Sequence, residues 1–303
     1  MTRHFLTGNE LSAAELDALL ARAAELKAQP LSSGALAGRS VALVFERPST
    51  RTRVSFEVGV HELGGLPLVL RPDELQISRG ESPRDTALVL SRHVAAVGVR
   101  TGPHALLEEL ARWATVPVFN MLTAEHHPCQ PLADLLTVRE SFGATATAGL
   151  KLAYVGDGNN MARSLAVLGT LAGMDVAIAS PSGYALAPDS VPLSPQARGS
   201  VTLHEDPREA AAGAHVLYTD VWVSMGDEDT AQERRRLLAP YRIDEQLLAV
   251  ADPAAIVLHC LPAHPGEEIS EEVLYGERQR IWDQAENRRH AQKALLELLL
   301  GDG

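Results

Sequence analysis

Short apolar runs alternate with longer amphipathic stretches through the first half of the chain. Runs with the length and composition of β-strands occur at residues 41–45, 66–70, 94–100 and 117–120. Helical spacing of apolar residues predicts helices at residues 13–23, 51–63 and 104–114, and another that starts after Ser82. Ser12 with Glu15 has the pattern of a capping box, and Ser82 is followed by proline and an acid, which favour a helix start.

The same alternation begins again at Lys151. Five short apolar or β-branched runs follow, and most are separated by Ala- and Leu-rich segments of helix length; the runs are residues 152–155, 176–179, 201–204, 216–219 and 256–259. A last amphipathic helix is predicted at residues 285–300. Strand–helix alternation is typical of parallel sheets that are covered on both faces. We therefore predict an α/β fold with two doubly wound parallel-sheet domains, divided within residues 141–149.

Composition agrees with two ordinary globular domains. The chain has 303 residues, of which 46% are hydrophobic and 22% charged, and a domain usually has about 100–200 residues. No apolar run reaches the ~18 residues of a membrane span, and no apolar segment of a signal peptide follows the first residues. The net charge of −12 argues against a nucleic-acid partner. Two cysteines, Cys129 and Cys260, cannot form a disulfide framework, so we expect a cytoplasmic location.

Polar residues gather directly after the predicted strands. They are Ser49 to Arg53, Arg100, His127 to Gln130, Asp157 to Asn160, Asp220 to Gly226, and His259 with Cys260. Ligands of open α/β sheets bind outside the carboxyl ends of the strands, so these positions are candidate site residues.

The segment from Ser49 to Arg53 has the composition of an anion site. Its hydroxyl and guanidinium groups lie where a strand turns into a helix, and the free N–H groups of a helix start attract negative charge. The alternative interpretation is a capped helix with a solvated charged face. Three features favour an oxyanion or phosphate site: hydroxyl and guanidinium residues occur together, they follow a strand, and a further arginine, Arg100, ends another predicted strand.

The stretch Phe45-Glu46-Arg47-Pro48-Ser49-Thr50-Arg51-Thr52-Arg53 resembles the carbamoyl-phosphate signature of the aspartate/ornithine carbamoyltransferase family. Arg100 and the motif His127-Pro128-Cys129-Gln130 match two further family positions. The resemblance implies phosphate contacts from Ser49, Thr50, Arg51 and Thr52. It also implies contacts of Arg100, His127 and Gln130 with the carbamoyl group.

Gln76 lies in a polar loop that, in similar proteins, reaches into the site of a neighbouring subunit. The family form has Leu-Gly after this glutamine, whereas this chain has Ile77-Ser78. The departure weakens the assignment of Gln76 to carbamoyl phosphate, and an exposed loop residue is the alternative. A second departure, Pro265 where many relatives have arginine, concerns local loop contacts only.

Two motifs suggest other chemistries that the residues do not favour: the Gly156-Asp157-Gly158 loop a dinucleotide site, and the His126-His127-Pro128-Cys129 segment a metal site. A dinucleotide fingerprint needs a third glycine and an acid after the next strand, where this chain has Ser180. Zinc ligation by His126, His127 and Cys129 lacks a second ligand pair at zinc spacing. We expect no metal and no cofactor.

The second half resembles the ornithine-using branch of the family. The shared motifs are Gly156-Asp157-Gly158-Asn159-Asn160, Asp220-Val221-Trp222-Val223-Ser224-Met225-Gly226 and His259-Cys260-Leu261-Pro262. The resemblance implies ornithine contacts from Asn160, Asp220, Ser224 and Met225. It places Cys260 and Leu261 between the two substrates and returns Arg288 to the carbamoyl-phosphate side. Residues 224–229 have the composition of a lid, or alternatively of a solvated acidic loop.

By this resemblance, residues 1–140 form a carbamoyl-phosphate-binding domain, on which a C-terminal helix at residues 284–303 packs, and residues 150–283 form an ornithine-binding domain. The implied reaction carbamoylates the δ-amine of L-ornithine to give citrulline and phosphate, with Cys260, Arg100 and His127 as catalytic residues. The family suggests a homotrimer or an assembly of trimers. Three alternatives are a relative that uses another amine such as putrescine, a nicotinamide-dependent dehydrogenase, and a non-catalytic homologue.

Overall fold

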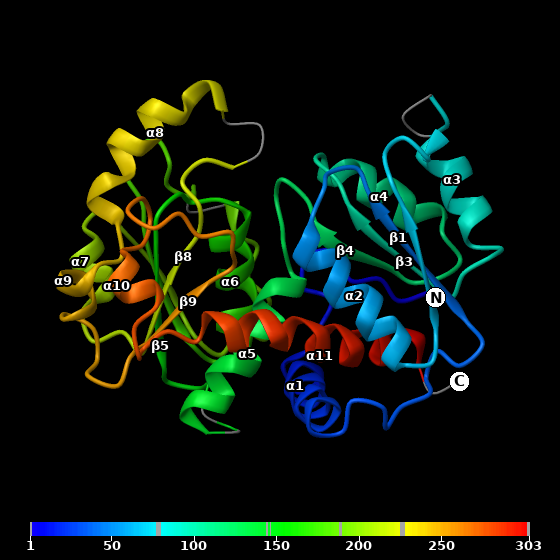
Figure 1. Ribbon diagram of the computed structural model, residues 1–303, viewed down its shortest axis with the longest axis horizontal. Helices are drawn as coiled ribbons and strands as arrows, with labels where there is room; N and C mark the ends of the chain where they lie inside the picture. The colour runs from blue at the N-terminus through cyan, green and yellow to red at the C-terminus, as the bar shows by residue number, and fades with distance from the viewer. Residues whose placement is uncertain are drawn as a thin grey trace. The chain divides into compact units, whose positions relative to one another are not determined.

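A computed structural model describes residues 2–76, 80–143, 145, 147–187, 190–224 and 228–301. The chain divides into two compact units (Figure 1). Unit 1 comprises Met1–Leu136 and Glu286–Gly303, and unit 2 comprises Thr137–Ala285. Two helices belong partly to each unit, α5 (Cys129–Phe142) and α11 (Ile281–Leu300). Each unit is described by itself below.

Unit 1 contains a four-stranded parallel sheet in the order β2-β1-β3-β4. Its strands are β1 (Ser40–Phe45), β2 (Leu66–Leu70), β3 (Ala96–Arg100) and β4 (Val118–Leu122). Its helices, besides its parts of α5 and α11, are α1 (Ala13–Ala28), α2 (Thr50–Glu62), α3 (Pro83–Leu90) and α4 (His104–Trp113). The strand order reverses between β1 and β3, so a ligand site is expected at the carboxyl ends of these two strands.

Unit 2 contains a five-stranded parallel sheet in the order β7-β6-β5-β8-β9. The strands are β5 (Lys151–Val155), β6 (Asp175–Ala179), β7 (Val201–His204), β8 (Val216–Thr219) and β9 (Ile256–His259). Its helices include α6 (Asn160–Leu171), α7 (Pro207–Ala211), α8 (Ala231–Leu238), α9 (Glu245–Leu248) and α10 (Glu271–Leu274), with short 3₁₀ turns at Glu228–Thr230 and Ala239–Tyr241. Here the order reverses between β5 and β8.

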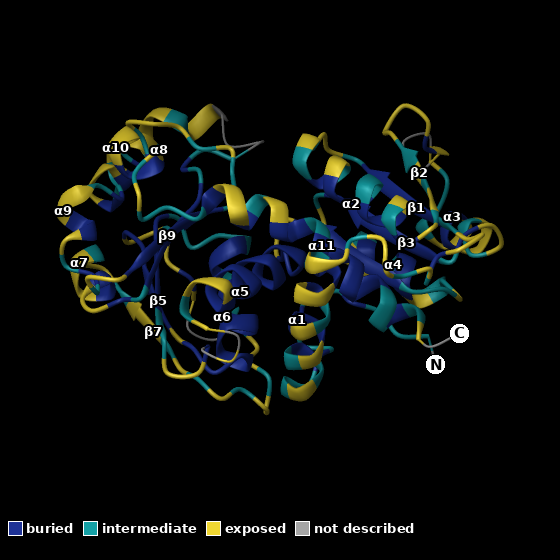
Figure 2. Ribbon diagram, turned by 60° about the horizontal axis from the view of Figure 1, so that its bottom comes forward, coloured by how far each residue is buried: buried dark blue, intermediate teal, exposed yellow. Residues whose placement is uncertain are grey.

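The central strands are buried because their sheets are covered on both faces. Every residue of β3 and β8 is buried, whereas every residue of the edge strands β2 and β7 is exposed or half-buried. In Figure 2 the strands are mostly dark blue, and exposed residues gather on helix surfaces and loops. Phe56 of α2 stacks on Phe119 of β4 with ring centroids 5.1 Å apart, which joins a helix to the sheet of unit 1.

The predicted fold class is confirmed: both sheets are entirely parallel. Most predicted elements differ from the observed ones by one or two residues. The helix predicted at 13–23 continues to Ala28, five residues farther. Two other differences have a local cause. The strand predicted at 94–100 begins at Ala96, because the Val94 N–H still donates to Leu90 O at the end of α3. The last helix begins at Ile281 rather than 285, where the Gln279 side chain accepts a hydrogen bond from the Ile281 N–H.

Within the described residues, no helix is both long and apolar enough to cross a membrane.

Candidate functional site

The switch point of unit 1 presents the start of α2. Ser49 is the N-cap of this helix, and its hydroxyl accepts a hydrogen bond of 3.3 Å from the Thr52 N–H. The first turn of α2 contains no acidic residue, so its positive end is not neutralised from within the helix. Thr50 is exposed and Arg51 is half-buried. This helix start therefore has the character that an anion site requires.

Helix α11 brings a further guanidinium group, that of Arg288, to the start of α2. The Arg288 Nη2 donates to Thr52 Oγ1 at 2.8 Å, although the two residues are 236 positions apart. Both side chains are buried. Farther along the same two helices, the ammonium of Lys293 lies 2.6 Å from a carboxylate oxygen of Glu62. Helix α11 therefore contacts α2 near both ends of α2, at Thr52 and at Glu62.

Arg100, His127 and Gln130 are all buried in unit 1. Arg100 ends β3, and it pairs in the sheet with Phe45, the last residue of β1. His127 precedes α5, and its carbonyl accepts a hydrogen bond from the Gln130 N–H. The Gln130 amide nitrogen donates to Asp134 Oδ1 at 2.8 Å. The sheet and the start of α5 hold these three residues.

Burial lowers the pKa of His127 well below its ordinary value, and the positive charges of Arg288 and Arg100 lower it further. The imidazole is therefore neutral at physiological pH. A neutral imidazole donates a hydrogen bond from one nitrogen only. His127 is suited to polarise a carbonyl oxygen by donation, not to supply a positive charge.

Gln76 is exposed, and its carbonyl accepts a hydrogen bond from the Glu81 N–H. Residues 77–79, which carry the departure from the family pattern, lie outside the described residues. A role for Gln76 in a site stays a prediction.

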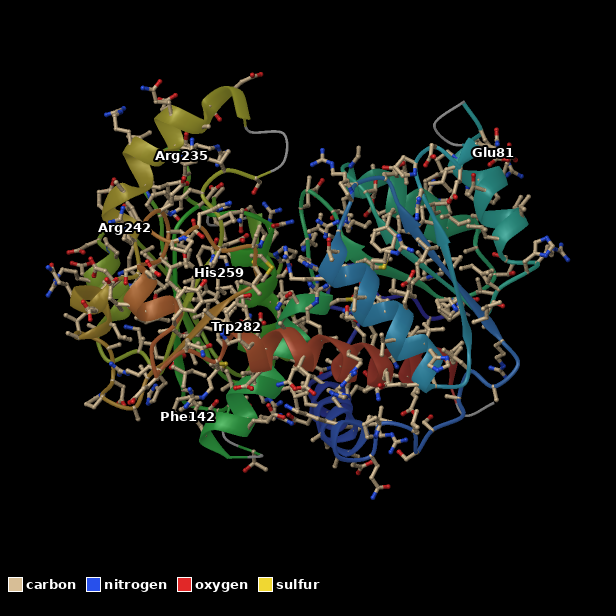
Figure 3. All side chains as sticks on the ribbon, viewed as in Figure 1. Glu81, Phe142, Arg235, Arg242, His259 and Trp282 are labelled. Carbon is tan, nitrogen blue, oxygen red and sulfur yellow. The ribbon has the colours of Figure 1, made fainter. Side chains whose placement is uncertain are left out.

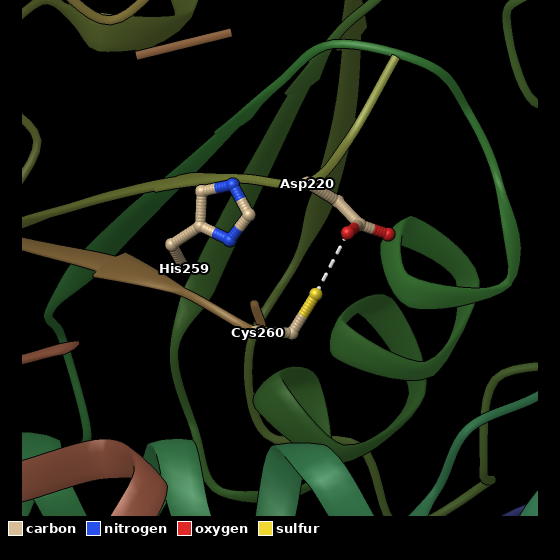
Figure 4. Close-up of side chains that lie close together, drawn as sticks. All are labelled: Asp220, His259 and Cys260. Carbon is tan, nitrogen blue, oxygen red and sulfur yellow. Dashed lines mark hydrogen bonds between the residues drawn. The ribbon is translucent and has the colours of Figure 1, made fainter. Parts of the chain in front are cut away.

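The switch point of unit 2 contains a network centred on Asp220, which directly follows β8. One carboxylate oxygen accepts from the Cys260 thiol at 2.8 Å (Figure 4), and the other accepts from the Asn159 amide at 2.9 Å. Asn159 is also the N-cap of α6, because its Oδ1 accepts from the Met161 and Ala162 N–H groups. The loops after β5, β8 and β9 thus meet at one carboxylate.

Tyr154 of β5 donates its hydroxyl to Asn159 Oδ1 at 3.2 Å. Burial raises the pKa of Tyr154 well above its ordinary value, and the nearby negative charges of Asp220 and Asp157 add to the effect. The phenol is therefore a neutral donor that orients Asn159.

The sequence motifs include Asn159 and Asp157 but do not assign them a role. Asp157 forms an ion pair of 2.7 Å with Arg234 of α8, so α8 is fixed to the loop after β5. Its partner Arg234 could not have been found from the motif, because nothing in the sequence indicates which arginine of α8 turns toward that loop.

Both ring nitrogens of His259, which precedes the thiol in sequence, have hydrogen-bonding partners other than the thiol. Its Nδ1 accepts from the Leu261 N–H at 2.8 Å and its Nε2 lies 3.1 Å from Glu268 Oε1. Figure 3 places His259 in the interior of unit 2, at the end of β9. Asp220 accepts the hydrogen bond that the Cys260 thiol donates.

Asp220, His259 and Cys260 have potential metal-ligand atoms within 4.8 Å of one another. Both ring nitrogens of His259 already have hydrogen-bonding partners, and the thiol proton is donated to Asp220. This bonding does not favour a metal ion, and the absence of a resident metal stays a prediction.

The structure describes two of the three remaining residues that are predicted to contact ornithine. Asn160 is the first residue of α6 and is half-buried, and Ser224 is half-buried after β8. Leu261 follows Cys260 with φ 62°, in the left-handed region. Met225 and the centre of the predicted lid, residues 225–227, lie outside the described residues.

Comparison with known proteins gives matches along nearly the whole chain. Residues 3–140 match the family model "Aspartate/ornithine carbamoyltransferase, carbamoyl-P binding domain", and residues 148–299 match its "Asp/Orn binding domain". A protein of Acidothermus cellulolyticus named ornithine carbamoyltransferase is 54% identical, over 99% of this chain and 97% of its own length. One of Methanoculleus marisnigri with the same name is 50% identical, over 100% and 98%.

Comparison with solved structures also gives matches along nearly the whole chain. The ornithine carbamoyltransferase of Pyrococcus furiosus has a TM-score of 0.94 and 44% identity, over 100% of this chain and 98% of its own. An N-acetyl-L-ornithine transcarbamylase variant has a TM-score of 0.86 and 33% identity, over 98% and 99%. With both of its family domains matched and relatives at half identity over their full length, the chain belongs to the aspartate/ornithine carbamoyltransferase family.

Proposed function

We propose that the chain is an ornithine carbamoyltransferase, a transferase that moves the carbamoyl group from carbamoyl phosphate to the δ-amine of L-ornithine and releases citrulline and phosphate. The observation that carries this function is the match of nearly the whole chain to relatives with that name, at 50% identity or more. The two networks at the switch points supply groups suited to the two substrates.

Carbamoyl phosphate is assigned to unit 1. The free N–H groups at the start of α2 and the side chains around it are suited to phosphate. The assigned phosphate contacts are Ser49, Thr50, Arg51 and Thr52, with Arg288 reaching them through Thr52. Gln76 is assigned to the same substrate, from a neighbouring subunit.

The carbamoyl group is assigned to Arg100, His127 and Gln130. When the amine attacks, negative charge develops on the carbamoyl oxygen. Buried donors that are already in place stabilise such charge, and the loss of one typically costs about 3–4 kcal/mol. Neutral His127 and cationic Arg100 are both buried donors of this kind.

Ornithine is assigned to unit 2, with contacts from Asn160, Asp220, Ser224 and Met225. Cys260 and Leu261 are assigned to carbamoyl phosphate. A free alkyl ammonium has a pKa of about 10.4, so only about a thousandth of it is nucleophilic at neutral pH. The δ-amine must therefore lose a proton. The Cys260 thiol, which donates to the Asp220 carboxylate, is suited to accept that proton while it passes its own to Asp220.

In the transfer, a carbon–nitrogen bond forms between the δ-amine and the carbamoyl carbon, and the bond from that carbon to the phosphate oxygen breaks. Phosphate takes the electron pair of the broken bond. These steps call for no redox cofactor and no covalent intermediate with the protein.

Assembly and location are proposed from the resemblance and from the thiols. We propose a homotrimer, which light scattering on the purified chain tests as a mass of three chains. We propose a cytoplasmic location because neither cysteine forms a disulfide, as is usual in a reducing compartment.

A citrulline assay tests the substrate assignment. The purified chain is given carbamoyl phosphate with ornithine, putrescine, acetylornithine or aspartate, and the carbamoylated product is measured. We expect rapid turnover with ornithine alone. Faster turnover with putrescine would assign the chain to another amine, and no turnover with any amine, together with no calorimetric binding of carbamoyl phosphate, would refute a carbamoyltransferase.

A further inference from the structure

His259 and Glu268 form a pair in unit 2 that the reaction above leaves without a role. Both side chains are completely buried, and Nε2 of His259 lies 3.1 Å from Oε1 of Glu268. The same carboxylate oxygen accepts a hydrogen bond from the His264 N–H. Burying an ionisable carboxylate costs free energy unless its oxygens are satisfied. The pair therefore needs an explanation beyond filling space.

The two nitrogens of His259 have different partners, and together these partners fix its protonation. Nδ1 accepts from the Leu261 N–H at 2.8 Å, so it cannot itself carry a proton. A neutral imidazole has one N–H and one acceptor nitrogen. Nε2 is therefore the protonated nitrogen, and it donates to Glu268. The carboxylate selects this tautomer, because only an N–H at Nε2 can donate to it.

The backbone of His259 is fixed as well. Its N–H donates to Gln284 Oε1 at 3.0 Å, and the Gln284 amide donates to the Tyr218 hydroxyl at 3.1 Å. The imidazole is thus held both at its backbone and at its ring, at the carboxyl end of β9.

The bond to Nδ1 has a consequence for the next two residues. Leu261 has φ 62°, which is unfavourable for a residue with a β-carbon and persists where surrounding contacts enforce it. The hydrogen bond from the Leu261 N–H to Nδ1 is such a contact. Cys260 lies between His259 and Leu261, and its thiol donates to Asp220 Oδ1 at 2.8 Å. The backbone turn at Leu261 therefore contributes to the direction of the thiol.

We propose that Glu268 is a positioning residue for carbamoyl transfer. By fixing the Nε2–H tautomer of His259, it keeps Nδ1 as an acceptor for Leu261 and thereby directs the Cys260 thiol toward Asp220. Glu268 itself does not touch substrate. The inference rests on the proposed function in so far as that function assigns Cys260 and Leu261 to the reaction.

Glu268→Gln and Glu268→Ala form the first matched pair. Glutamine keeps an oxygen that accepts from Nε2–H, whereas alanine has no acceptor. We expect Glu268→Ala to lower kcat by about 10–100-fold, the usual range for loss of an orienting partner, and Glu268→Gln to restore most of it. The KM for carbamoyl phosphate should stay within about threefold in both, because its assigned contacts are in unit 1. Glu267→Gln, next in sequence and paired with Arg235, is the control and should keep the parent kcat.

Alkylation of Cys260 by iodoacetamide reports the same geometry without any turnover. Cys129 is completely buried, so Cys260 is the thiol that reacts in the folded chain. We expect Glu268→Ala to change the alkylation rate several-fold and Glu268→Gln to leave it unchanged. If the parent chain lacks carbamoyltransferase activity but shows this pattern, the proposed function fails, whereas the positioning of the Cys260 thiol by Glu268 is supported.

A second pair covers the case in which Glu268→Ala does not fold. In His259→Asn the side-chain oxygen takes the place of Nδ1 and still accepts from Leu261, whereas in His259→Gln the amide takes the place of Nε2. We expect the asparagine variant to keep more kcat than the glutamine variant. Three outcomes would overturn the proposal. Glu268→Ala could melt at a lower temperature yet keep the parent kcat and alkylation rate, or Glu268→Gln could be as impaired as Glu268→Ala. The third outcome is a higher kcat for His259→Gln than for His259→Asn.

Discussion

Cys260 shows how a functional side chain depends on its neighbours. Its thiol donates to Asp220, which is held in turn by Asn159, the cap of α6. The motif His259-Cys260-Leu261-Pro262 identified the cysteine, but the motif does not indicate which residue accepts the hydrogen bond of its thiol. His259 is adjacent in sequence and lies within 4.8 Å of the thiol, yet its two ring nitrogens bond to Glu268 and to the Leu261 N–H. Residue identity was predictable at this position, and the hydrogen-bonding partner was not.

Replacing Cys260 tests the proposed proton route. Cys260→Ala removes the thiol between the amine and Asp220, so we expect a lower kcat and a shifted pH profile of kcat. The measurement is the citrulline rate across pH at saturating substrates. A profile identical in shape to that of the parent chain would remove the thiol from proton transfer, and unchanged melting temperature is the control for folding.

At the scale of elements, the strand order explains where the candidate residues lie. In each sheet the order reverses once, and the polar loops follow the two strands at that reversal. The alternation of strands and helices in the sequence predicted the elements, the parallel sheets and the loops that carry polar residues. It did not predict which helix covers which strand. The family resemblance implied that Arg288 returns to the carbamoyl-phosphate side, and the structure added its direct hydrogen bond to Thr52, which joins α11 to α2.

The contact between Lys293 and Glu62 gives a prediction for this attachment. The ammonium is completely buried and also donates to the carbonyls of Leu26 and Pro30. Removing one partner of a buried ion pair typically costs about 3–5 kcal/mol, because the other charge loses its compensation. We therefore expect Glu62→Gln to lower the free energy of unfolding by about that amount in urea titrations.

The control is an ion pair of the same kind at the surface. Arg22 and Glu25 lie on α1, and the glutamate side chain is 65% exposed. Glu25→Gln should change the free energy of unfolding by less than about 1 kcal/mol. Equal effects of the two glutamate substitutions would show that burial of the Lys293 pair has no energetic consequence.

For the whole molecule, three histidines of unit 1 predict how stability depends on pH. Burial is the largest cause of the lowered pKa of His4, His127 and His290, and for His290 the pKa falls to about 4. Below about pH 6.5 the unfolded chain binds protons that these folded side chains do not, and for His290 this difference extends to about pH 4. Stability is therefore fully present above about pH 6.5 and is lost as the pH falls, by up to about 1.4 kcal/mol per pH unit for each histidine.

Unfolding in urea at pH 7 and pH 5 measures this dependence. We expect the parent chain to be less stable at pH 5, and His290→Gln to lose less stability than the parent between the two values. An identical pH dependence in the variant would contradict the lowered pKa of His290.

The sequence by itself determined the two parallel α/β units, the loops that carry the polar residues, and the family. These follow from local information, namely the period of apolar residues and short motifs whose members are neighbours along the chain. The tertiary structure decided which distant groups meet: Arg288 with Thr52, Cys260 with Asp220, and His259 with Glu268. Such pairs depend on strand order, helix packing and side-chain direction together, and none of these is encoded by the spacing of residues in a single segment.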